Sequence, residues 1–418
     1  MFELILYLLA LVFIPSFLLK KYTKFKSYGI FHLICLKRNP KFLRKFAKSS
    51  FLNFLSEAGV IFGFGILGVL YLWKNFKSFK KILVHFSFFL SFLLFFYFFL
   101  QPTPFIYLIL FLGFGFFILI ALAMKGFEIV ASYFFGIQPS PGVALIIPGV
   151  SIPGSPIEVP LIAWFGFVLA IVVHELAHGI LAEKAKVSVK SFGLLTLGLI
   201  PLGAYTEINE KKLKGKSNFD KIKFFSAGSS INIFISFILA VVLLVSQTQI
   251  DIQKEYLNNI RSAVISEVYP GSPAELAGLK KGDVIYSPQN LFNVVGQRNT
   301  SFYLNTSRGL LNLTTDEKGY IGVKLSEFTF HKPFGLDFWV KKSYIEIVYW
   351  TFFLNLMLGV FNFAPFAILD GLKMFPIILG TLFGRKLNKK AILKISKGLT
   401  YLVLFFLILN FLPYFIRI

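Results

Sequence analysis

Residues 171–183 read IVVHELAHGILAE, which places two histidines and a glutamate in an otherwise apolar helical run. His174 and His178 are four residues apart, so a helix presents both imidazoles on one face. Neutral imidazoles so placed suit zinc, and a catalytic zinc site keeps one position for water. Glu175 adjoins the first histidine and can accept a proton from that water. Histidines that only pack between helices are the less favoured alternative, because unpaired ionisable groups in lipid cost at least ~2.5 kcal/mol each.

The composition indicates a polytopic α-helical membrane protein. The 418 residues are 56% hydrophobic and only 15% charged, and 54 of them are phenylalanine. The net charge of +23 arises from Lys and Arg clusters beside apolar runs, where basic residues orient helices and meet anionic lipid. No stacking or zinc-finger pattern accompanies this charge, so we expect the lipid bilayer, and no nucleic acid, as a partner. The single cysteine, Cys35, allows no intrachain disulfide.

About eight apolar runs are long enough to cross a bilayer, which takes roughly 20 residues each. They lie near 2–19, 51–73, 82–100, 105–124, 159–182, 224–246, 345–371 and 399–416. The first run lacks the basic start and the cleavage site of a signal peptide, so we expect a retained span. The first four runs form an N-terminal block, residues 1–124, that is rich in phenylalanine and poor in motifs. The other four form a catalytic core in two parts, 125–246 and 343–418.

Basic segments predict the orientation of these spans. Residues 20–50 carry ten Lys or Arg and no acid, and the segments 209–223 and 385–397 are also strongly basic, so all three should be cytoplasmic. The stretch from Gly126 to Glu183 has no Lys or Arg, so it should begin outside and bring the HELAH run toward the cytoplasm. The lysine-rich loop 74–81 conflicts with this topology. Either a neighbouring segment does not fully span, or this loop is an exception to the rule.

The run after the HELAH motif, SVKSFGLLTLGLIPLGAYTEI (188–208), is apolar but broken by glycines and a proline. It is short for a full span. Extended backbone at membrane depth is tolerated only where protein or a water-filled cavity satisfies its polar groups. We therefore expect a membrane-embedded re-entrant or β-hairpin element beside the site, with a short surface loop as the alternative.

Zinc bound by two histidines needs a third protein ligand, commonly a carboxylate. Asp370, in NFAPFAILDG (362–371), is the only aspartate within an expected span and is the candidate. Pro365 should kink or break its helix, and Gly371 permits a close backbone approach at the metal. The alternative is that Asp370 marks a helix end at the cytoplasmic interface.

Residues 247–342 are mixed in polarity and predict a small inserted α/β domain. Within them, SAVISEVYPGSPAELAGLKKGDVIYS (262–287) predicts a strand, a turn, a short helix, a glycine cap, a tight turn and a strand. This stretch resembles a PDZ domain, a fold that binds extended segments by adding a strand to a sheet edge. The topology above places this PDZ-like domain outside the membrane.

Together, the HExxH motif, the later N-x-x-P-x-x-x-x-D-G run and the PDZ-like insert resemble the site-2 protease family of intramembrane zinc metalloproteases, over roughly 140–372. The residues that match the second motif are Asn362, Pro365, Leu369, Asp370 and Gly371. A third family motif is matched within SAGSSIN (226–232) at Ala227, Gly228 and Asn232, with Ser229 where proline is usual. Residues 1–124 carry no such resemblance.

The resemblance implies hydrolysis of a peptide bond in or near a transmembrane helix of a single-span substrate already trimmed elsewhere, which is regulated intramembrane proteolysis. It implies Zn²⁺ as the cofactor, held by the two histidines and Asp370, with Glu175 as the catalytic base. The hairpin could hold the unwound substrate by edge pairing. Asn232 or Asn362 could hydrogen-bond that substrate, although helix packing explains either asparagine equally well. The PDZ-like domain is expected to filter substrates by size or to dock their termini, with a plain spacer as the alternative.

Two other functions stay open on the sequence. A metal-binding membrane transporter would also bury histidine and aspartate, but no inverted repeat relates the two halves of the chain. A non-catalytic scaffold that presents the PDZ-like domain would have no use for Glu175. We expect an integral cell-membrane protein with its active site toward the cytoplasmic side.

Overall fold

The computed structural model describes residues 12–18, 20–21, 26–38, 40–100, 105–144, 146–152, 154–155, 157–198, 200–366 and 369–416. The chain divides into two compact units, a larger one of Met1–Val241 with Ile347–Ile418 and a smaller one of Val242–Glu346. The smaller unit includes the segment 247–342, for which the sequence predicts an inserted domain.

The larger unit is mainly helical. Its α-helices, two of which continue into the smaller unit, are α2 (Phe42–Phe46), α3 (Ser50–Phe76), α4 (Phe79–Leu100), α5 (Phe105–Phe134), α6 (Ala163–Lys184), α7 (Glu210–Lys214), α8 (Asn218–Val245), α12 (Leu336–Asn362), α13 (Asp370–Phe383) and α14 (Lys389–Phe411), and a 3-10 turn, η1, follows at Leu412–Tyr414. Among the described residues, seven helices are long and apolar enough to cross a membrane when only total length and composition are counted: α3, α4, α5, α6, α8, α12 and α14. The expected span at 2–19 lies largely outside the described residues.

Helix α3 bends sharply at Gly65, whose φ of 53° lies in the left-handed region that glycine tolerates. Gly68 and Val60 would be about 12 Å apart along a straight helix. Instead, a Cβ at Gly68 would lie 2.2 Å from the carbonyl oxygen of Val60. The helix therefore folds back into two arms that are each shorter than a span, and this agrees with the first explanation for the loop 74–81. Lys74 also donates a hydrogen bond to a backbone carbonyl of α13.

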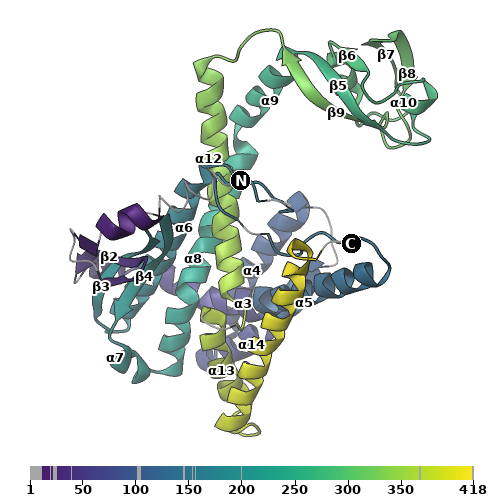
Figure 1. Cartoon of the computed structure of the whole chain (residues 1–418). Coiled ribbons are helices and arrows are strands. Elements are labelled where there is room, and N and C mark those ends of the chain that lie inside the picture. The colour runs from purple at the N-terminus through teal and green to yellow at the C-terminus, as the bar shows by residue number, and fades with distance from the viewer. Residues whose placement is uncertain are drawn as a thin grey trace. The chain divides into compact units, whose positions relative to one another are not determined.

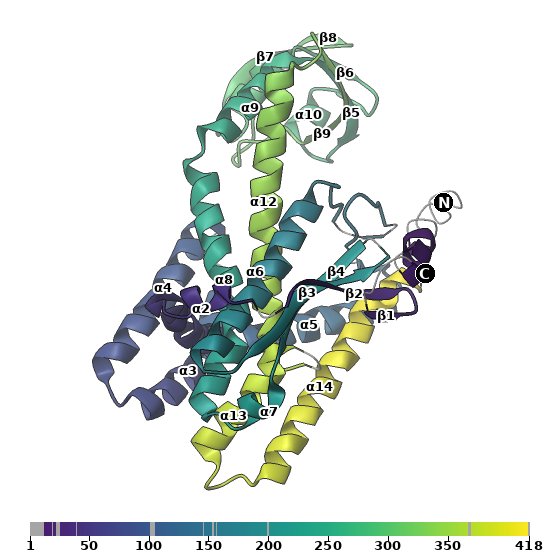
Figure 2. The same cartoon turned by 90° about the vertical axis from the view of Figure 1, so that its left-hand side faces the viewer.

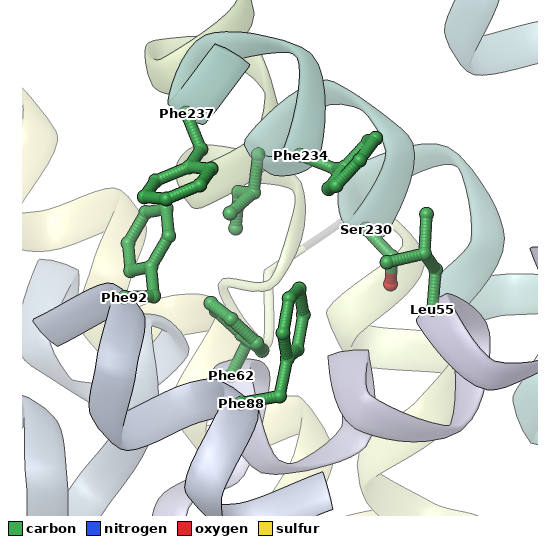
Figure 3. Close-up of a pocket in the computed structure, with 8 residues that line it drawn as sticks. Leu55, Phe62, Phe88, Phe92, Ser230, Phe234 and Phe237 are labelled. Carbon is green, nitrogen blue, oxygen red and sulfur yellow. The ribbon is translucent and has the colours of Figure 1, made fainter. Parts of the chain in front are cut away.

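The core between α3, α4 and α8 is largely aromatic. Figure 3 shows phenylalanines from these three helices pointing toward one another around a small pocket. The ring centres of Phe62 and Phe92 are 5.1 Å apart in an edge-to-face arrangement, and those of Phe92 and Phe237 are 6.0 Å apart. Because lipid is as apolar as these side chains, close packing and ring geometry determine how such helices associate.

A four-stranded antiparallel sheet lies on one flank of the helices of the larger unit (Figures 1 and 2). Its strands, in order across the sheet, are β1 (Lys26–Tyr28), β2 (Phe31–Arg38), β3 (Val189–Leu197) and β4 (Ile200–Ile208). Strands β3 and β4 form the hairpin predicted at 188–208, with Gly193 opposite Tyr205. Strands β1 and β2 belong to the basic segment 20–50, for which the sequence pattern predicts no strand.

The smaller unit holds a five-stranded antiparallel sheet of order β8-β7-β6-β5-β9. Its elements are α9 (Gln247–Asn259), β5 (Ile260–Val268), α10 (Pro273–Leu276), β6 (Val284–Tyr286), α11 (Gln289–Val294), β7 (Ser301–Thr306), β8 (Gly309–Thr314) and β9 (Val323–Phe330). The run 262–287 folds as strand, short helix and strand in the predicted order. Ser272 Oγ caps the short helix by accepting from the Glu275 amide at 3.3 Å, and Gly278 follows with a φ of 83°. The likeness of this unit to a PDZ domain stays a prediction.

Candidate metal centre

Helix α6 carries two of the predicted metal ligands. His174 and His178 are both buried, with exposed fractions of 6% and 5%. Their Nε2 atoms lie 3.1 Å apart. The spacing of four residues therefore brings two donor atoms to one point, because residues i and i+4 share a helix face.

Asp370 reaches the same point from a distant part of the chain. Helix α12 ends at Asn362, and α13 begins at Asp370. The helix break predicted at Pro365 is thus present, since proline lacks the N–H that would continue the helix. Asp370 therefore lies in the first turn of α13. Oδ2 of Asp370 lies 3.3 Å from Nε2 of His174 and 3.0 Å from Nε2 of His178.

These three donor atoms fit a tetrahedral zinc ion. Bonds of about 2.0–2.1 Å from zinc to nitrogen or oxygen place neighbouring ligand atoms about 3.3 Å apart. The triangle of donors has edges of 3.0, 3.1 and 3.3 Å. Two imidazoles and one carboxylate are also a common set for catalytic zinc, with the fourth position left open.

Helix α8 orients both histidines. Nδ1 of His178 lies 2.7 Å from the backbone carbonyl oxygen of Phe224, which places the ring proton on Nδ1 and leaves Nε2 as the metal donor. Gly228 lies against His174, because a Cβ at this position would be 2.4 Å from Nε2 and 2.6 Å from Cδ2. Nδ1 of His174 is buried and has no hydrogen-bond partner among the described residues. The imidazole of His174 therefore occupies space that only glycine leaves free.

The N-terminal helices hold the segment that carries the third candidate ligand. Phe363, in the turn after α12, is fully buried. A Cβ at Gly63 of α3 would lie 2.6 Å from its ring, and a Cβ at Gly115 of α5 would lie 2.4 Å from its carbonyl oxygen. A Cβ at Gly371 would lie 2.0 Å from the same carbonyl oxygen, so the close approach at Gly371 is to Phe363. Three glycines packed around one residue thus set where α13 begins.

A cavity of about 600 Å³ opens over the metal centre, and Glu175 lines it. A carboxylate oxygen of Glu175 lies within 4.8 Å of a ring nitrogen of each histidine. Strand β4 forms part of the wall, and Thr206 Oγ1 donates a hydrogen bond of 2.7 Å to the backbone oxygen of Glu175. The predicted hairpin is therefore tied directly to the helical turn that carries the candidate base.

The two asparagines named from the sequence have different surroundings. Asn362 lines the cavity, and its Nδ2 donates to the Leu358 carbonyl at 3.0 Å. Asn232 is fully buried, and its Nδ2 donates to the Ala170 carbonyl of α6 at 3.2 Å. Asn232 thus joins α8 to α6, and Asn362 is the one that borders the space above the metal centre.

Lys373 is a site residue that the sequence motifs do not identify. Its Nζ lies 3.3 Å from Oδ1 of Asp370 and 5.4 Å from the ring centre of Phe225. The spacing of three residues on one helix is the signal that could have found it. The roles of Gly228 and of the Phe224 carbonyl leave no side-chain signal in the sequence.

Comparison with known proteins agrees with this geometry. The model of a family described as peptidase family M50 matches residues 162–410. An uncharacterized protein of Methanocaldococcus jannaschii is 27% identical over 241 residues, which cover 53% of this chain and 59% of that protein. A Thermotoga maritima protein named "Putative zinc metalloprotease" is 28% identical over 157 residues, which cover 30% of this chain and 29% of that protein. The matches cover less than two thirds of each relative's length. Over most of its own length, this chain belongs to peptidase family M50, the site-2 protease family.

Proposed function

We propose that the protein is an intramembrane zinc metalloprotease that hydrolyses a peptide bond in or near a transmembrane helix of single-span membrane proteins, as a step of regulated intramembrane proteolysis. One observation carries this proposal. His174, His178 and Asp370 converge with edges of 3.0–3.3 Å beneath a cavity that Glu175 lines, among helices apolar enough to cross a membrane. Membership of family M50 and the named relative support a membrane metalloprotease.

The chain's own residues divide the chemistry between them. When bound, zinc would polarise the substrate carbonyl and make a neighbouring water more acidic. Glu175 accepts a proton from the water as the water oxygen attacks the carbonyl carbon. Glu175 then passes that proton to the nitrogen as the C–N bond breaks. The Phe224 carbonyl and Lys373 meanwhile keep His178 and Asp370 in a fixed orientation.

Strand β4 is the element best placed to hold the substrate. It is an edge strand of its sheet, and its Thr206 contacts the helical turn of Glu175. A substrate must unwind before attack, and an extended segment can add to a sheet edge. We expect a cysteine introduced at Leu202, which is exposed on β4, to form disulfide cross-links with cysteines near the cleavage site of a reporter. Absence of cross-links, with Cys35 replaced by serine, would argue for another binding mode.

The active site is proposed to lie toward the cytoplasm and the smaller unit outside. Lys214 and Lys221, which line the cavity, belong to the basic segment 209–223. A cysteine placed at Lys214 should react with an impermeant thiol reagent in inverted vesicles and stay unlabelled in right-side-out vesicles.

The smaller unit would dock or filter substrate termini, so its replacement by a short linker should allow cleavage of untrimmed substrates. Cleavage that stays restricted to trimmed substrates would contradict that role.

The decisive experiment compares the wild type with Glu175→Gln in detergent, using a single-span reporter and measuring bound zinc in both. Wild type should cleave the reporter, and the variant should lose at least about 100-fold in rate, since general base catalysis contributes about that much or more. Equal zinc content in the two proteins would show that the site is intact. Equal cleavage by both would overturn the proposal.

A further inference from the structure

A second groove, of about 950 Å³, lies over strands β2, β3 and β4. It shares Tyr205 and Thr206 with the cavity over the metal centre, so the two spaces adjoin at β4. Gly193 forms part of the sheet beneath it. A Cβ at Gly193 would lie 2.8 Å from the hydroxyl oxygen of Tyr205 and 2.2 Å from the carbonyl oxygen of Ile34, so the tyrosine lies across the glycine.

Two basic side chains of this groove lack an acidic partner. Lys37 and Arg38 stand at the end of β2, are exposed, and form no ion pair with any part of the chain that the structure describes. The acid that lines the groove, Glu207, lies 3.3 Å from Lys190 and accepts a hydrogen bond from Ser191 at 2.8 Å. Positive charge in the groove is therefore only partly neutralised.

The cavity over the metal centre has the same character. Lys214 and Lys221 line it, and neither is paired with an acid among the described side chains. Glu210 is the one acid in its lining besides Glu175 and Asp370. The basic residues that line the two adjoining spaces are Lys37, Arg38, Lys190, Lys214, Lys221 and Lys373. A bound zinc ion would add further positive charge beneath them.

We propose that the substrate segment beside the cleaved bond carries acidic side chains, which bind Lys37 and Arg38 in this groove. The proposal rests on the proteolytic function proposed above. Strands lie about 4.8 Å apart, so a substrate strand added to the free edge of β4 lies about 14 Å from β2, and an extended chain covers that distance in about four residues. The acidic side chains are therefore expected about four residues from the segment held at β4.

This charge would let the enzyme select among membrane proteins. Cytoplasmic flanks of transmembrane helices are rich in Lys and Arg, so the groove repels the commonest flanks. Discrimination through repulsion of the wrong partner is as effective as attraction of the right one. A rare acidic flank would thus identify a substrate.

Anionic lipid is the competing occupant, because basic residues near a membrane also attract lipid headgroups. The chain has 43 basic and 20 acidic residues, so basic character alone decides nothing. The shared lining by Tyr205 and Thr206 places the groove next to the cavity over the metal centre and favours a peptide, because that cavity is where the proposed reaction takes place.

The test uses the full-length protein in detergent free of anionic lipid. Three single-span reporters differ only in carrying aspartate, asparagine or lysine at positions two to five on either side of the cleavage site. We expect kcat/KM to fall about tenfold from the aspartate to the lysine reporter, and the difference to shrink at high salt. Lys37→Glu with Arg38→Glu should reverse this order, and Lys37→Gln with Arg38→Gln should abolish it. Lys389→Glu with Lys390→Glu, an exposed basic pair outside the groove, should leave it unchanged.

Three results would overturn the proposal. Equal cleavage of the three reporters by wild type would contradict the proposed preference for an acidic flank. It would not contradict the protease function. A wild-type preference that persists in both Lys37 and Arg38 double variants, together with weaker binding of those variants to phosphatidylglycerol vesicles, would assign the groove to lipid. If wild type cleaves every reporter no faster than Glu175→Gln does, the proposed function is wrong, and this inference is wrong with it.

Discussion

Nε2 of His178 and Oδ2 of Asp370 lie 3.0 Å apart, close to the separation of two ligand atoms on one zinc ion. Nδ1 of His178 carries a proton, because the Phe224 carbonyl at 2.7 Å can only accept. The short contact between Nε2 and Oδ2 is favourable either with a second proton on the imidazole or with a cation held by both atoms. A bound zinc ion would take the second role, with both atoms as its ligands.

Removal of a ligand should therefore be distinguishable from removal of the base. Asp370→Asn replaces an anionic ligand with a weak neutral one, so bound zinc should fall from about one per chain to about a tenth of that after dialysis against a chelator. Glu175→Gln should keep its zinc and lose activity. Elemental analysis of both purified variants makes the comparison. Full zinc retention by Asp370→Asn would point to another third ligand.

Gly228→Ala tests the contact that α8 makes with His174. Its new Cβ would lie 2.4 Å from the metal-binding Nε2, so either the imidazole or α8 must move. We expect zinc content and activity to fall at least about tenfold, in line with loss of a supporting contact to a ligand. Gly398→Ala is the matched control, because a Cβ there meets no atom within 4 Å. Normal zinc content in Gly228→Ala would show that the site adapts.

Lys373 should act as a positioning residue for Asp370. Lys373→Met removes the contact of 3.3 Å to Oδ1, and we expect zinc affinity to fall about tenfold. Lys373→Arg keeps a donor and should stay near the wild-type affinity. Competition with a chelator of known affinity measures both. In the Co²⁺-substituted protein, a change in the visible spectrum of Lys373→Met would report a carboxylate that has rotated at the metal. An unchanged affinity and spectrum would exclude this role.

The convergence of the candidate ligands could be predicted from the sequence because their chemistry is local. The spacing of His174 and His178 defines a helix face, and Asp370 stands out as an acid in an apolar run. Gly228 matches a family motif, but its contact with His174 could not be predicted, since that contact depends on the side chain that Gly228 lacks. The packing of Gly63 and Gly115 around Phe363 could not be predicted either, because these glycines also act by lacking a side chain.

The N-terminal block shows why apolar composition is a weak guide to packing. Its phenylalanines suit lipid and protein surroundings equally, so the sequence does not tell which face of a helix is buried. The fold-back of α3 at Gly65 depends on one dihedral angle that hydropathy does not register. Strand β2 could not be predicted, because it lies in a lysine-rich segment and is stabilised by pairing with β3, which follows more than 150 residues later.

Asp283 gives the smaller unit a predictable dependence on pH. Its hydrogen bond from Arg308 holds the pKa of the Asp283 carboxyl below its usual value, and the Lys280 amide donates to it at 2.7 Å. A lowered folded-state pKa stabilises the fold above pH of about 4 and ceases to do so as the pH falls through the folded value. Hydrogen exchange of β5 and β6 in the full chain should be faster in Asp283→Asn at neutral pH. The difference should vanish near pH 3, and a difference that grows on acidification would contradict the assignment.

Glu57 and His85 form a buried pair within the N-terminal block, with Oε2 and Nε2 3.2 Å apart and side chains 13% and 6% exposed. Nδ1 of His85 lies 2.7 Å from the Lys81 carbonyl, so both ring nitrogens of His85 have a polar partner. Asn53 donates to the other oxygen of Glu57 at 2.7 Å. The pair thus joins α3 to α4 through groups that each need the other.

This dependence predicts a strongly non-additive mutant cycle. Glu57→Leu or His85→Phe alone leaves one buried polar partner unmatched and should lower the free energy of unfolding by about 3 kcal/mol. The double variant replaces both groups with apolar ones, and the phenylalanine keeps the ring contacts with Phe54 and Phe76, so it should be more stable than either single variant. Equilibrium unfolding in mixed micelles measures the cycle, and zinc content should stay constant throughout. Penalties that simply add would mean that the two groups are satisfied independently, by water or by other partners, and that α3 and α4 are held together by their aromatic contacts alone.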